Sequence, residues 1–540
     1  MSSIKNTLQK IKKYHKFTAI ILIFIVVFDF GYLLETGIWV NYYHHNFMIG
    51  TINDLLQGKH LLIDTFNQYG LFYPFILFLV FRTVLQFSYM NLYLAFMIGT
   101  VMYFAILYFF ILLITKKNLL SLVGLLVSMG VVMTFNFPTF PFSENYVWPG
   151  SIPLRYFFDA LVFLLVLKNR NFASRKLHFL TSGVVAFAVF YNLETGISLS
   201  IAYMFLLFTY VITKPLPLIK KVRYCLELSL PFLISAISIA LFFSIYTYAQ
   251  TSLMPDWALF WRFPLLYGAG LSNANTPVVG WHLYHLTVYF SVVTLYIFRT
   301  LFLKQSINWK WRVLTAYAFY GLFLLNYYMS RSYNSNLTLV SIPVIVLTIA
   351  FAGEKFTNAK KEVTFTRLIS IVIIVSLTIG SIYFTMGRLK RRVYGLETYK
   401  TTKKYPGNRG FIMVSYSEQE DFTANDLLKS VAEIKKLTPH QKKILLFSRF
   451  DVLILVMSEK THIISYPMHE QIYTLSELES MKKYLLHLPE KPEYIFIDTK
   501  NPLSTPPTSY NNAKELFETV KPYYSFYKKV GILDVYRLKQ

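Results

Sequence analysis

The stretch of sequence that decides the fold lies between Asn41 and Pro74 and reads NYYHHNFMIGTINDLLQGKHLLIDTFNQYGLFYP. It follows the first hydrophobic run of the chain, and the next run long enough to cross a membrane begins near residue 92. The stretch contains two aspartates, three histidines and a lysine. Ionisable groups held at a membrane usually have a functional role. This polar, aromatic segment is therefore the first place to look for function.

The rest of the chain indicates a membrane protein. It has 540 residues, of which 55% are hydrophobic and only 15% charged, more apolar surface than a soluble domain requires. Apolar runs of roughly 18–25 residues recur along it, as in membrane-spanning helices. The first run, near residues 17–37, follows a lysine-rich start and lacks a small-residue cleavage site, which predicts an uncleaved anchor.

We expect eleven membrane spans. They are residues 17–37, 92–115, 118–135, 153–168, 177–194, 196–213, 225–248, 283–303, 311–329, 336–353 and 367–386.

The distribution of Lys and Arg orients these spans. With the N-terminus inside, the inner segments carry 23 of these residues and the outer loops carry four, a strong asymmetry. The asymmetry requires that the hydrophobic stretch Leu71–Phe87 does not cross the membrane. That stretch contains Pro74 and Arg82, and we expect a helix that lies along the outer interface or dips into it.

The fold class that follows is a polytopic α-helical membrane protein with a C-terminal extracytoplasmic α/β domain. We expect a multi-span domain over residues 1–399, with a first outer loop at 38–91, and a soluble α/β domain over 400–540. Alternating patterns predict strands at residues 444–447, 461–464 and 493–498. Helical patterns cover residues 423–437, 475–486 and 512–520.

Several function classes lack their usual signatures. The net charge of +25 could suggest nucleic acid, but the basic residues punctuate the apolar runs, as orientation signals do, so no nucleic acid partner is expected. The single cysteine, Cys225, excludes an internal disulfide. Walker, G-x-G-x-x-G, H-E-x-x-H and C-x-x-C motifs are absent from the sequence, which removes the usual marks of ATP-driven transport and thiol-ligated zinc.

Two carboxylates in the first outer loop are candidate catalytic groups. Asp64 lies between apolar residues that could seat it at the interface, where it could accept a proton from an acceptor hydroxyl. The structural alternative is an N-cap for the next turn. Asp54 lies in a helical pattern over residues 47–56, where a solvated face or a cap is the alternative.

Other polar residues on the outer side complete the candidate set. His44 and His45 could act in catalysis, or bind phosphate or a divalent metal, although adjacent residues point to different faces. Lys59 could contact a phosphate or be a snorkelling lysine. An isolated outer arginine suits a lipid phosphate. The candidate donor-phosphate ligands are Arg331, Lys59 and His282, and the candidate substrate-pocket residues are Glu194, Glu144, Tyr69 and Gln68.

The layout and one motif resemble the GT-C glycosyltransferases, in particular the bacterial branch related to protein O-mannosyltransferases and lipid A aminoarabinose transferases. The resemblance covers about residues 17–120 and includes the run G-K-x-L-L-x-D-x-F-x-Q-Y-G at Gly58–Gly70, followed by a hydrophobic surface helix. It implies a polyprenyl-phosphate sugar as donor and transfer on the outer face of the membrane, usually with inversion. The acidic residue that acts as base or orients the acceptor would be Asp64 or Asp54.

One feature departs from that family. In members resembling aminoarabinose transferases an Asp-Glu pair closely follows the first span, and His44 and His45 occupy that slot in this chain. Either the acid has moved to Asp64 or this branch uses the histidines.

The expected function is transfer of a sugar from a polyprenyl-phosphate donor to an envelope glycan or lipid acceptor at a bacterial cytoplasmic (inner) membrane. The N-terminus would be cytoplasmic and the C-terminal domain extracytoplasmic. No cofactor is implied with certainty, although a divalent metal could take part. The alternatives are a lipid-linked glycan polymerase or ligase, and a transporter or flippase without bond chemistry. Transporters tend to place polar groups mid-span and to contain internal repeats, whereas these polar groups cluster on one side.

Overall fold

The computed structural model describes residues 17–23, 38–40, 44–134, 152–271, 275–278, 280–303, 305, 307–332, 334–358, 379, 406–407, 410–414, 424–448, 450–467, 471–498 and 512–540. The chain divides into two compact units. Unit 1 comprises Met1–Tyr32, Tyr93–Phe243 and Phe263–Thr401, and unit 2 comprises Leu33–Leu92, Ser244–Arg262 and Thr402–Gln540. The predicted boundary at residue 400 is close to Thr402, but unit 2 also takes in the whole of the predicted first outer loop and residues 244–262.

Three helices contribute residues to both units. They are α4 (Tyr89–Thr115), α10 (Leu218–Thr251) and α11 (Trp257–Gly268).

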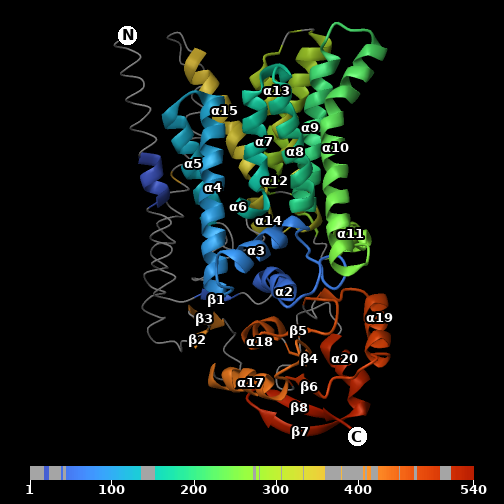
Figure 1. Ribbon diagram of the computed structural model, residues 1–540. Helices are drawn as coiled ribbons and strands as arrows, with labels where there is room; N and C mark the ends of the chain where they lie inside the picture. The colour runs from blue at the N-terminus through green and yellow to red at the C-terminus, as the bar shows by residue number, and fades with distance from the viewer. Residues whose placement is uncertain are drawn as a thin grey trace. The chain divides into compact units, whose positions relative to one another are not determined.

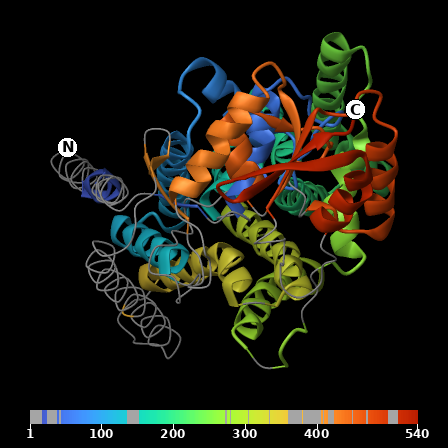
Figure 2. The same ribbon diagram turned by 90° about the horizontal axis from the view of Figure 1, so that it is seen from below.

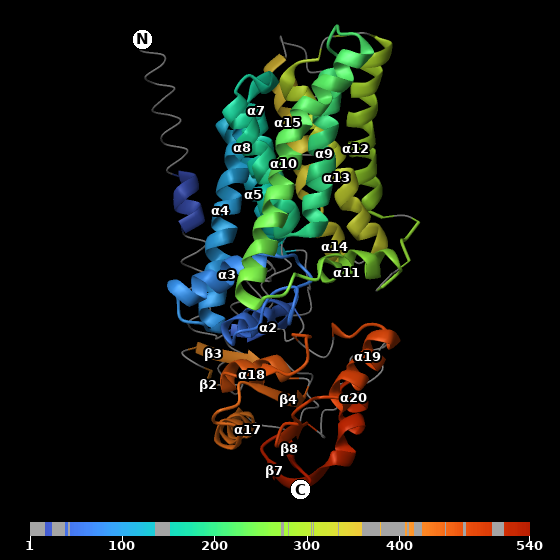
Figure 3. The ribbon, with the colours of Figure 1, turned by 45° about the vertical axis from the view of Figure 1, so that its right-hand side comes forward.

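Unit 1 consists of apolar helices that run beside one another (Figures 1 and 3). Contacts join α8 to α9, α9 to α13, and α13 to α7, α12 and α15. The remaining elements of the unit are α5 (Asn118–Thr134), α6 (Ile152–Arg155), α7 (Phe157–Lys168), η2 (Arg170–Phe172), α8 (Arg175–Tyr191), α9 (Leu193–Ile212), α12 (His282–Ile297), η3 (Phe298–Phe302), α13 (Trp309–Ser330), α14 (Asn334–Leu339) and α15 (Ile342–Asn358).

Helices occupy every predicted span between residues 92 and 353. In the described part of the chain, Asn91–Thr115, Leu193–Ile212 and Leu218–Thr251 are long and apolar enough to cross a membrane. The chain is therefore polytopic by helix length and composition. The first and last predicted spans lie largely outside the described residues, so the total of eleven stays a prediction.

The predicted span 336–353 is two helices rather than one. α14 ends at Leu339 and α15 begins at Ile342. Pro343 explains the break, because its ring cannot continue a helix from the preceding turn and it has no N–H to donate. Proline is tolerated in the first turn of α15, where the amide has no partner in the helix.

The C-terminal part of unit 2 is an α/β sandwich. Its sheet has the order β5-β4-β6-β8-β7, with β4 parallel to β5 and β6, and β8 antiparallel to β6 and β7. The strands are β4 (Lys443–Phe447), β5 (Thr461–His462), β6 (Tyr494–Ile497), β7 (Tyr524–Val530) and β8 (Leu533–Leu538).

Helices cover both faces of that sheet, with α17 and α18 on one face and α19 and α20 on the other (Figures 1 and 2). Every residue of β6 is buried, as expected for a strand covered on both faces. The helices are α17 (Ala424–Leu437), α18 (Asp451–Ser458), α19 (Leu475–Leu486) and α20 (Asn512–Val520), with the 3-10 turn η5 at Lys521–Tyr523.

The predicted first outer loop also belongs to unit 2. Its helix α2 (His44–Leu56) contacts α18 and β5, so chain segments four hundred residues apart pack together. Strand β1 (Ile38–Val40) pairs in parallel with β3 (Gly410–Val414), which also pairs with β2 (Pro406–Gly407).

Helix α3 (Phe72–Thr83) occupies the predicted non-crossing stretch. Its 12 residues rise only about 18 Å, well short of a hydrocarbon core of about 30 Å. The length of α3 therefore supports the prediction that this stretch does not cross the membrane.

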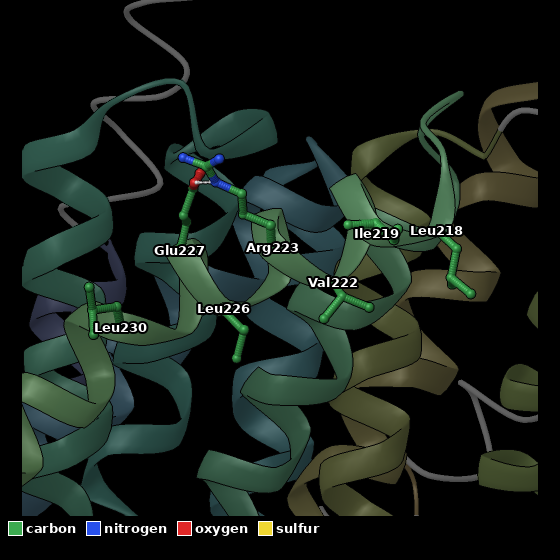
Figure 4. Close-up of a pocket in the computed structure, with 7 residues that line it drawn as sticks. All are labelled: Leu218, Ile219, Val222, Arg223, Leu226, Glu227 and Leu230. Atoms are coloured by element: carbon green, nitrogen blue, oxygen red, sulfur yellow. Dashed lines mark hydrogen bonds and ion pairs between the residues drawn. The ribbon is translucent and has the colours of Figure 1, made fainter.

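A groove of about 580 Å³ lies on α10 between Leu218 and Leu230 (Figure 4). Its lining is apolar apart from Arg223 and Glu227, whose side chains form an exposed ion pair at 2.9 Å. Exposed apolar side chains on a long helix are expected where that helix faces lipid, so we do not place the functional site in this groove.

Candidate functional site

The first-loop residues Asp54 and Lys59 meet in a buried cluster in unit 2. The Lys59 Nζ donates to Asp54 Oδ2 at 3.3 Å and to the Ile464 carbonyl at 2.8 Å. The Thr65 hydroxyl donates to the same carboxylate at 2.8 Å, and the Thr461 hydroxyl donates to its other oxygen. We call Asp54, Lys59, Thr65 and Thr461 the Asp54 cluster.

Burial dominates the electrostatics of this cluster. It raises the pKa of Asp54, against the opposing effects of Lys59, Thr461 and Thr65. It lowers the pKa of Lys59, against the opposing effect of Asp54. Side chains only 1% and 4% exposed cannot meet a ligand without opening the cluster. The geometry indicates a structural role for Asp54 and Lys59 and gives no support to a phosphate contact by Lys59, which stays a prediction.

Asp64 differs from Asp54 in being accessible. Its side chain is 36% exposed, and the His60 ring lies beside it, with Nδ1 3.7 Å from Asp64 Oδ2. Its amide donates to the His60 carbonyl at 3.0 Å inside a tight turn. Asp64 does not cap the next helix, since Leu71 is the N-cap of α3. The Asp64 carboxylate is therefore not used to cap α3.

Arg262 joins the three segments of unit 2. Its guanidinium lies 4.9 Å from the ring centroid of Phe66, 5.3 Å from that of Tyr466 and 5.7 Å from that of Tyr473. Phe66 in turn packs edge-on against Tyr466, with centroids 5.3 Å apart. These contacts are favourable because aromatic faces attract cations. We call Phe66, Tyr466 and Tyr473 the Arg262 cage.

Glu477 neutralises Arg262. It accepts from the Arg262 Nε, and the Arg262 Nη2 donates to the Gln471 carbonyl. Glu477 also accepts the amide protons of Tyr473 and Thr474 as part of the capping box of α19. Burial alone would raise the pKa of Glu477, but Arg262 and the two amides bring it below its usual value.

A second polar cluster lies in unit 1. Arg155 pairs with Glu194, which stands in the first turn of α9, and the Arg155 guanidinium lies 4.4 Å from the ring centroid of Tyr327. Arg331 lies 5.7 Å from the same ring and 3.5 Å from the ring centroid of Tyr267. We call Arg155 and Arg331 the arginine pair.

The ends of two helices build the arginine pair. Arg155 is the last residue of α6, and Arg331 is the C-cap of α13, where its amide bonds the Tyr328 carbonyl at 2.9 Å. The Arg331 Nη2 is buried and has no hydrogen-bond partner among the described residues. An arginine donor held without an acceptor is suited to an anionic ligand such as a phosphate oxygen.

The other predicted site residues make different contacts or lie outside the described part. His282 is buried, and its ring stacks on Tyr328 at 5.5 Å. Tyr69 is buried and Gln68 half-buried in the turn before α3. Glu144 and the side chains of His44 and His45 lie outside the described residues, although the backbone of α2 begins at His44.

In the part of the chain that the structure describes, no group of three or more His, Cys, Asp or Glu side chains could hold a metal ion. Because the side chains of His44 and His45 are not included, a role for a divalent metal stays a prediction.

Sequence reasoning missed two residues of unit 1. Arg155 was counted inside an apolar span, although it pairs with Glu194 and approaches Tyr327. Asp159 is 2% exposed and interacts with the hydroxyls of Tyr103 and Tyr320. The signal for both was present, because a charged residue within an apolar span is costly unless it has a partner.

Comparison with known proteins gave the following. No known family model and no curated protein matches the chain. Among solved structures, ArnT from Cupriavidus metallidurans bound to undecaprenyl phosphate is similar at 10% identity and a TM-score of 0.49, over 96% of this chain and 97% of that one. The apo state of the same protein is similar at 10% identity and a TM-score of 0.48, over 98% of each chain.

Proposed function

We propose that this chain is a GT-C-type membrane glycosyltransferase, which moves a sugar from a polyprenyl-phosphate donor to an envelope glycan or lipid acceptor. The proposed reaction takes place on the outer face of a bacterial cytoplasmic membrane and inverts the anomeric centre.

The arginine pair is the observation that carries the proposal. Two guanidinium groups approach one tyrosine ring at helix ends that the charge distribution predicts to be outside. Arg331 retains a buried donor without a partner among the described residues. Guanidinium groups suit phosphate because their planar donors match its oxygens. A phosphate carried on a lipid would arrive at such helix ends from the surrounding membrane.

The proposed mechanism is a single displacement. The acceptor hydroxyl oxygen forms a bond to the anomeric carbon, and the bond from that carbon to the phosphate oxygen breaks. Asp64 takes the hydroxyl proton. The polyprenyl phosphate leaves with the bonding electron pair, and the arginine pair stabilises the negative charge that accumulates on it. The transition state resembles an oxocarbenium ion, as in glycoside hydrolysis.

The probe for the proposed phosphate site is undecaprenyl phosphate. The motif at Gly58–Gly70 implies a polyprenyl phosphate as the carrier of the donor sugar. Undecaprenyl phosphate, which is bound in one of the two ArnT structures, is a lipid of this class.

A transporter without bond chemistry is the rival that one observation favours. Asp159 is a buried carboxylate within a predicted span, and such groups mark proton or solute pathways in many transporters. The two functions differ in their product, since only a transferase releases free polyprenyl phosphate.

The test is transfer of radiolabelled sugar from a panel of undecaprenyl-phosphate sugars, using the purified protein in liposomes with membrane glycan and lipid extracts as acceptors. Asp64→Asn should lower transfer by about 10²- to 10⁴-fold, because it removes a general base. It should leave binding of undecaprenyl phosphate unchanged. Arg331→Lys should weaken that binding, because a lysine cannot replace the planar fork of donors.

The matched control is Arg223→Lys on α10, an exposed arginine paired with Glu227. It should change neither transfer nor binding. Wild-type transfer by Asp64→Asn contradicts the role of Asp64, and unchanged binding by Arg331→Lys contradicts the phosphate site. Translocation of lipid or solute without release of polyprenyl phosphate would support the transporter instead.

A further inference from the structure

We propose that Arg262 and Thr461 are positioning residues, which hold residues 59–66 of the first outer loop and thereby fix the direction in which Asp64 is presented. This inference rests on the proposed role of Asp64 as the base. It gives residues 244–262 and the C-terminal segment a role in catalysis that requires no contact with either substrate.

Thr65, the residue after Asp64, belongs to the Asp54 cluster. The Thr65 hydroxyl bonds Asp54 Oδ2 at 2.8 Å, and Thr461 from β5 bonds the other oxygen of that carboxylate. The Asn53 side chain adds a bond of 2.7 Å to the Lys460 carbonyl beside β5. The strand β5 therefore supports the C-terminal side of the turn through Asp54.

The following residue is held by the Arg262 cage. Phe66 is 1% exposed and contacts both Arg262 and Tyr466. Its carbonyl accepts from the Thr51 hydroxyl at 3.1 Å, which joins it back to α2. The ring and the carbonyl of Phe66 are thus both fixed.

The N-terminal side of the turn is held at Leu62. Its φ of +61° lies in the left-handed region, which costs energy for a leucine. The Asp256 amide donates to the Leu62 carbonyl at 2.8 Å, and the Leu62 amide donates to the Thr65 carbonyl at 2.8 Å. A strained backbone persists only where its surroundings over-determine it, and Asp256 belongs to the same short segment as Arg262.

Asp64 is therefore a partly exposed carboxylate in a turn that is held at Leu62 on one side and at Thr65 and Phe66 on the other. Catalytic groups need this kind of support, since a displacement of about 1 Å can lower a rate about 10²-fold. Arg262 supports the turn through Phe66, and Thr461 supports it through Asp54 and Thr65. Both residues therefore act on Asp64 by positioning the turn.

The first experiment compares Arg262→Lys with the wild type, using the donor sugar that gives transfer in the wild type. Lysine keeps the charge but cannot bond Glu477 and the Gln471 carbonyl with one planar group. We expect kcat to fall about 10²-fold, with the KM for the donor within about twofold of the wild-type value. Thr461→Val, which removes one hydroxyl at nearly constant shape, should give a smaller loss of the same kind.

A double variant separates positioning from general damage. If Arg262 acts through Asp64, then Arg262→Lys added to Asp64→Asn should lower the residual transfer by less than about threefold. Equal fractional losses in the two backgrounds would show that Arg262 acts elsewhere, and would overturn the proposal.

Hydrogen exchange supplies a readout that does not require activity. In the full-length protein, the amides of residues 60–66 should exchange at least about tenfold faster in Arg262→Lys, whereas those of α8 and α9 keep the wild-type rate. Where residual transfer is too low to measure, this comparison decides. Unchanged exchange at residues 60–66 in Arg262→Lys would overturn the positioning role of Arg262. Faster exchange in that variant, together with no transfer by the wild type, would overturn only the proposed function.

Arg537→Lys is the matched control in unit 2. Arg537 bonds Glu493 at 3.0 Å, but both side chains are about half exposed. It should change neither kcat nor exchange at residues 60–66. An equal effect of Arg537→Lys and Arg262→Lys would also contradict the proposal.

Discussion

At the scale of single residues, the buried pair of Asp54 and Lys59 illustrates an ion pair that specifies structure more than it stabilises it. Burial raises the pKa of Asp54, so its contribution favours folding at low pH and is lost as pH rises through the folded-state pKa. Burial lowers the pKa of Lys59, so its contribution favours folding at high pH and is lost as pH falls through the folded-state pKa. Burial therefore opposes the charged form of both partners.

Removing one partner should be worse than removing both. Lys59→Met leaves a buried carboxylate without its cation and should lower the free energy of unfolding by about 3–5 kcal/mol. Asp54→Asn combined with Lys59→Met should recover about 2 kcal/mol or more of that loss, because the introduced amide has no charge and can still accept a threonine hydroxyl. Denaturant-induced unfolding of the detergent-solubilised protein, followed by tryptophan fluorescence, measures both.

Additive losses in the double variant would contradict this account of the pair. Lys435→Met serves as the control, because Lys435 pairs with Glu459 on the surface, and such pairs contribute at most about 1 kcal/mol.

The sequence predicts some of these roles and not others. Asp64 lies in the loop where the sequence predicts it and is 36% exposed, and its role as a base stays a prediction. The burial of Asp54 could not be predicted, because its partner Thr461 is 407 residues away in the chain. Apolar neighbours of Asp54 in α2 were visible in the sequence, but the element that covers them was not.

At the scale of elements, the sharp connection between α8 and α9 depends on two residues. Asn192 is the C-cap of α8 and the N-cap of α9, where its side chain accepts the Thr195 amide at 3.1 Å. Gly196 lies one turn further, and a Cβ at this position would overlap the backbone of Ala188 and Val189. Glycine is required because the two helices approach closely at this point.

Gly196→Ala should therefore lower the free energy of unfolding by about 1–3 kcal/mol, the usual cost of overpacking. Gly183→Ala is the matched control in α8, since the nearest atom to its added Cβ would be the Ser235 Oγ at 3.7 Å. The control should be neutral or stabilising by up to about 1 kcal/mol, because alanine favours a helix. Thermal unfolding of the two variants decides, and equal stabilities would contradict the role given to Gly196.

Most elements with strong periodicity were predictable. The helices expected at residues 423–437, 475–486 and 512–520 are α17, α19 and α20, within one residue at each end. The strands expected at 444–447, 461–464 and 493–498 are β4, β5 and β6, with β5 shorter than expected. β1 was not predicted, because its three residues follow an apolar run directly and pair with a strand far along the chain.

At the scale of the whole molecule, unit 2 gathers three segments that the membrane helices separate in sequence. Residues 33–92, 244–262 and 402–540 belong to one compact unit, so we expect their described parts to lie on the same side of the membrane. The asymmetry of Lys and Arg predicts that this side is the outer one.

Cysteine labelling of intact cells tests that placement. In a Cys225→Ser background, Lys483→Cys on α19 should react with a membrane-impermeant thiol reagent, because Lys483 is exposed in unit 2. Lys176→Cys on α8 is the matched control, because Lys176 is equally exposed but lies in a segment predicted to be inside. It should react only after permeabilisation. The reverse pattern would invert the topology and place the first loop in the cytoplasm.

The distance of 407 residues between Asp54 and Thr461 also has a consequence during biosynthesis. At about 5–20 residues per second, a ribosome completes Thr461 roughly 20 to 80 s after Asp54. Throughout that interval α2 exists, yet the strand that will cover its aspartate does not. The Asp54 cluster therefore stays incomplete in the nascent chain until translation is nearly finished, so the order of synthesis itself delays its assembly.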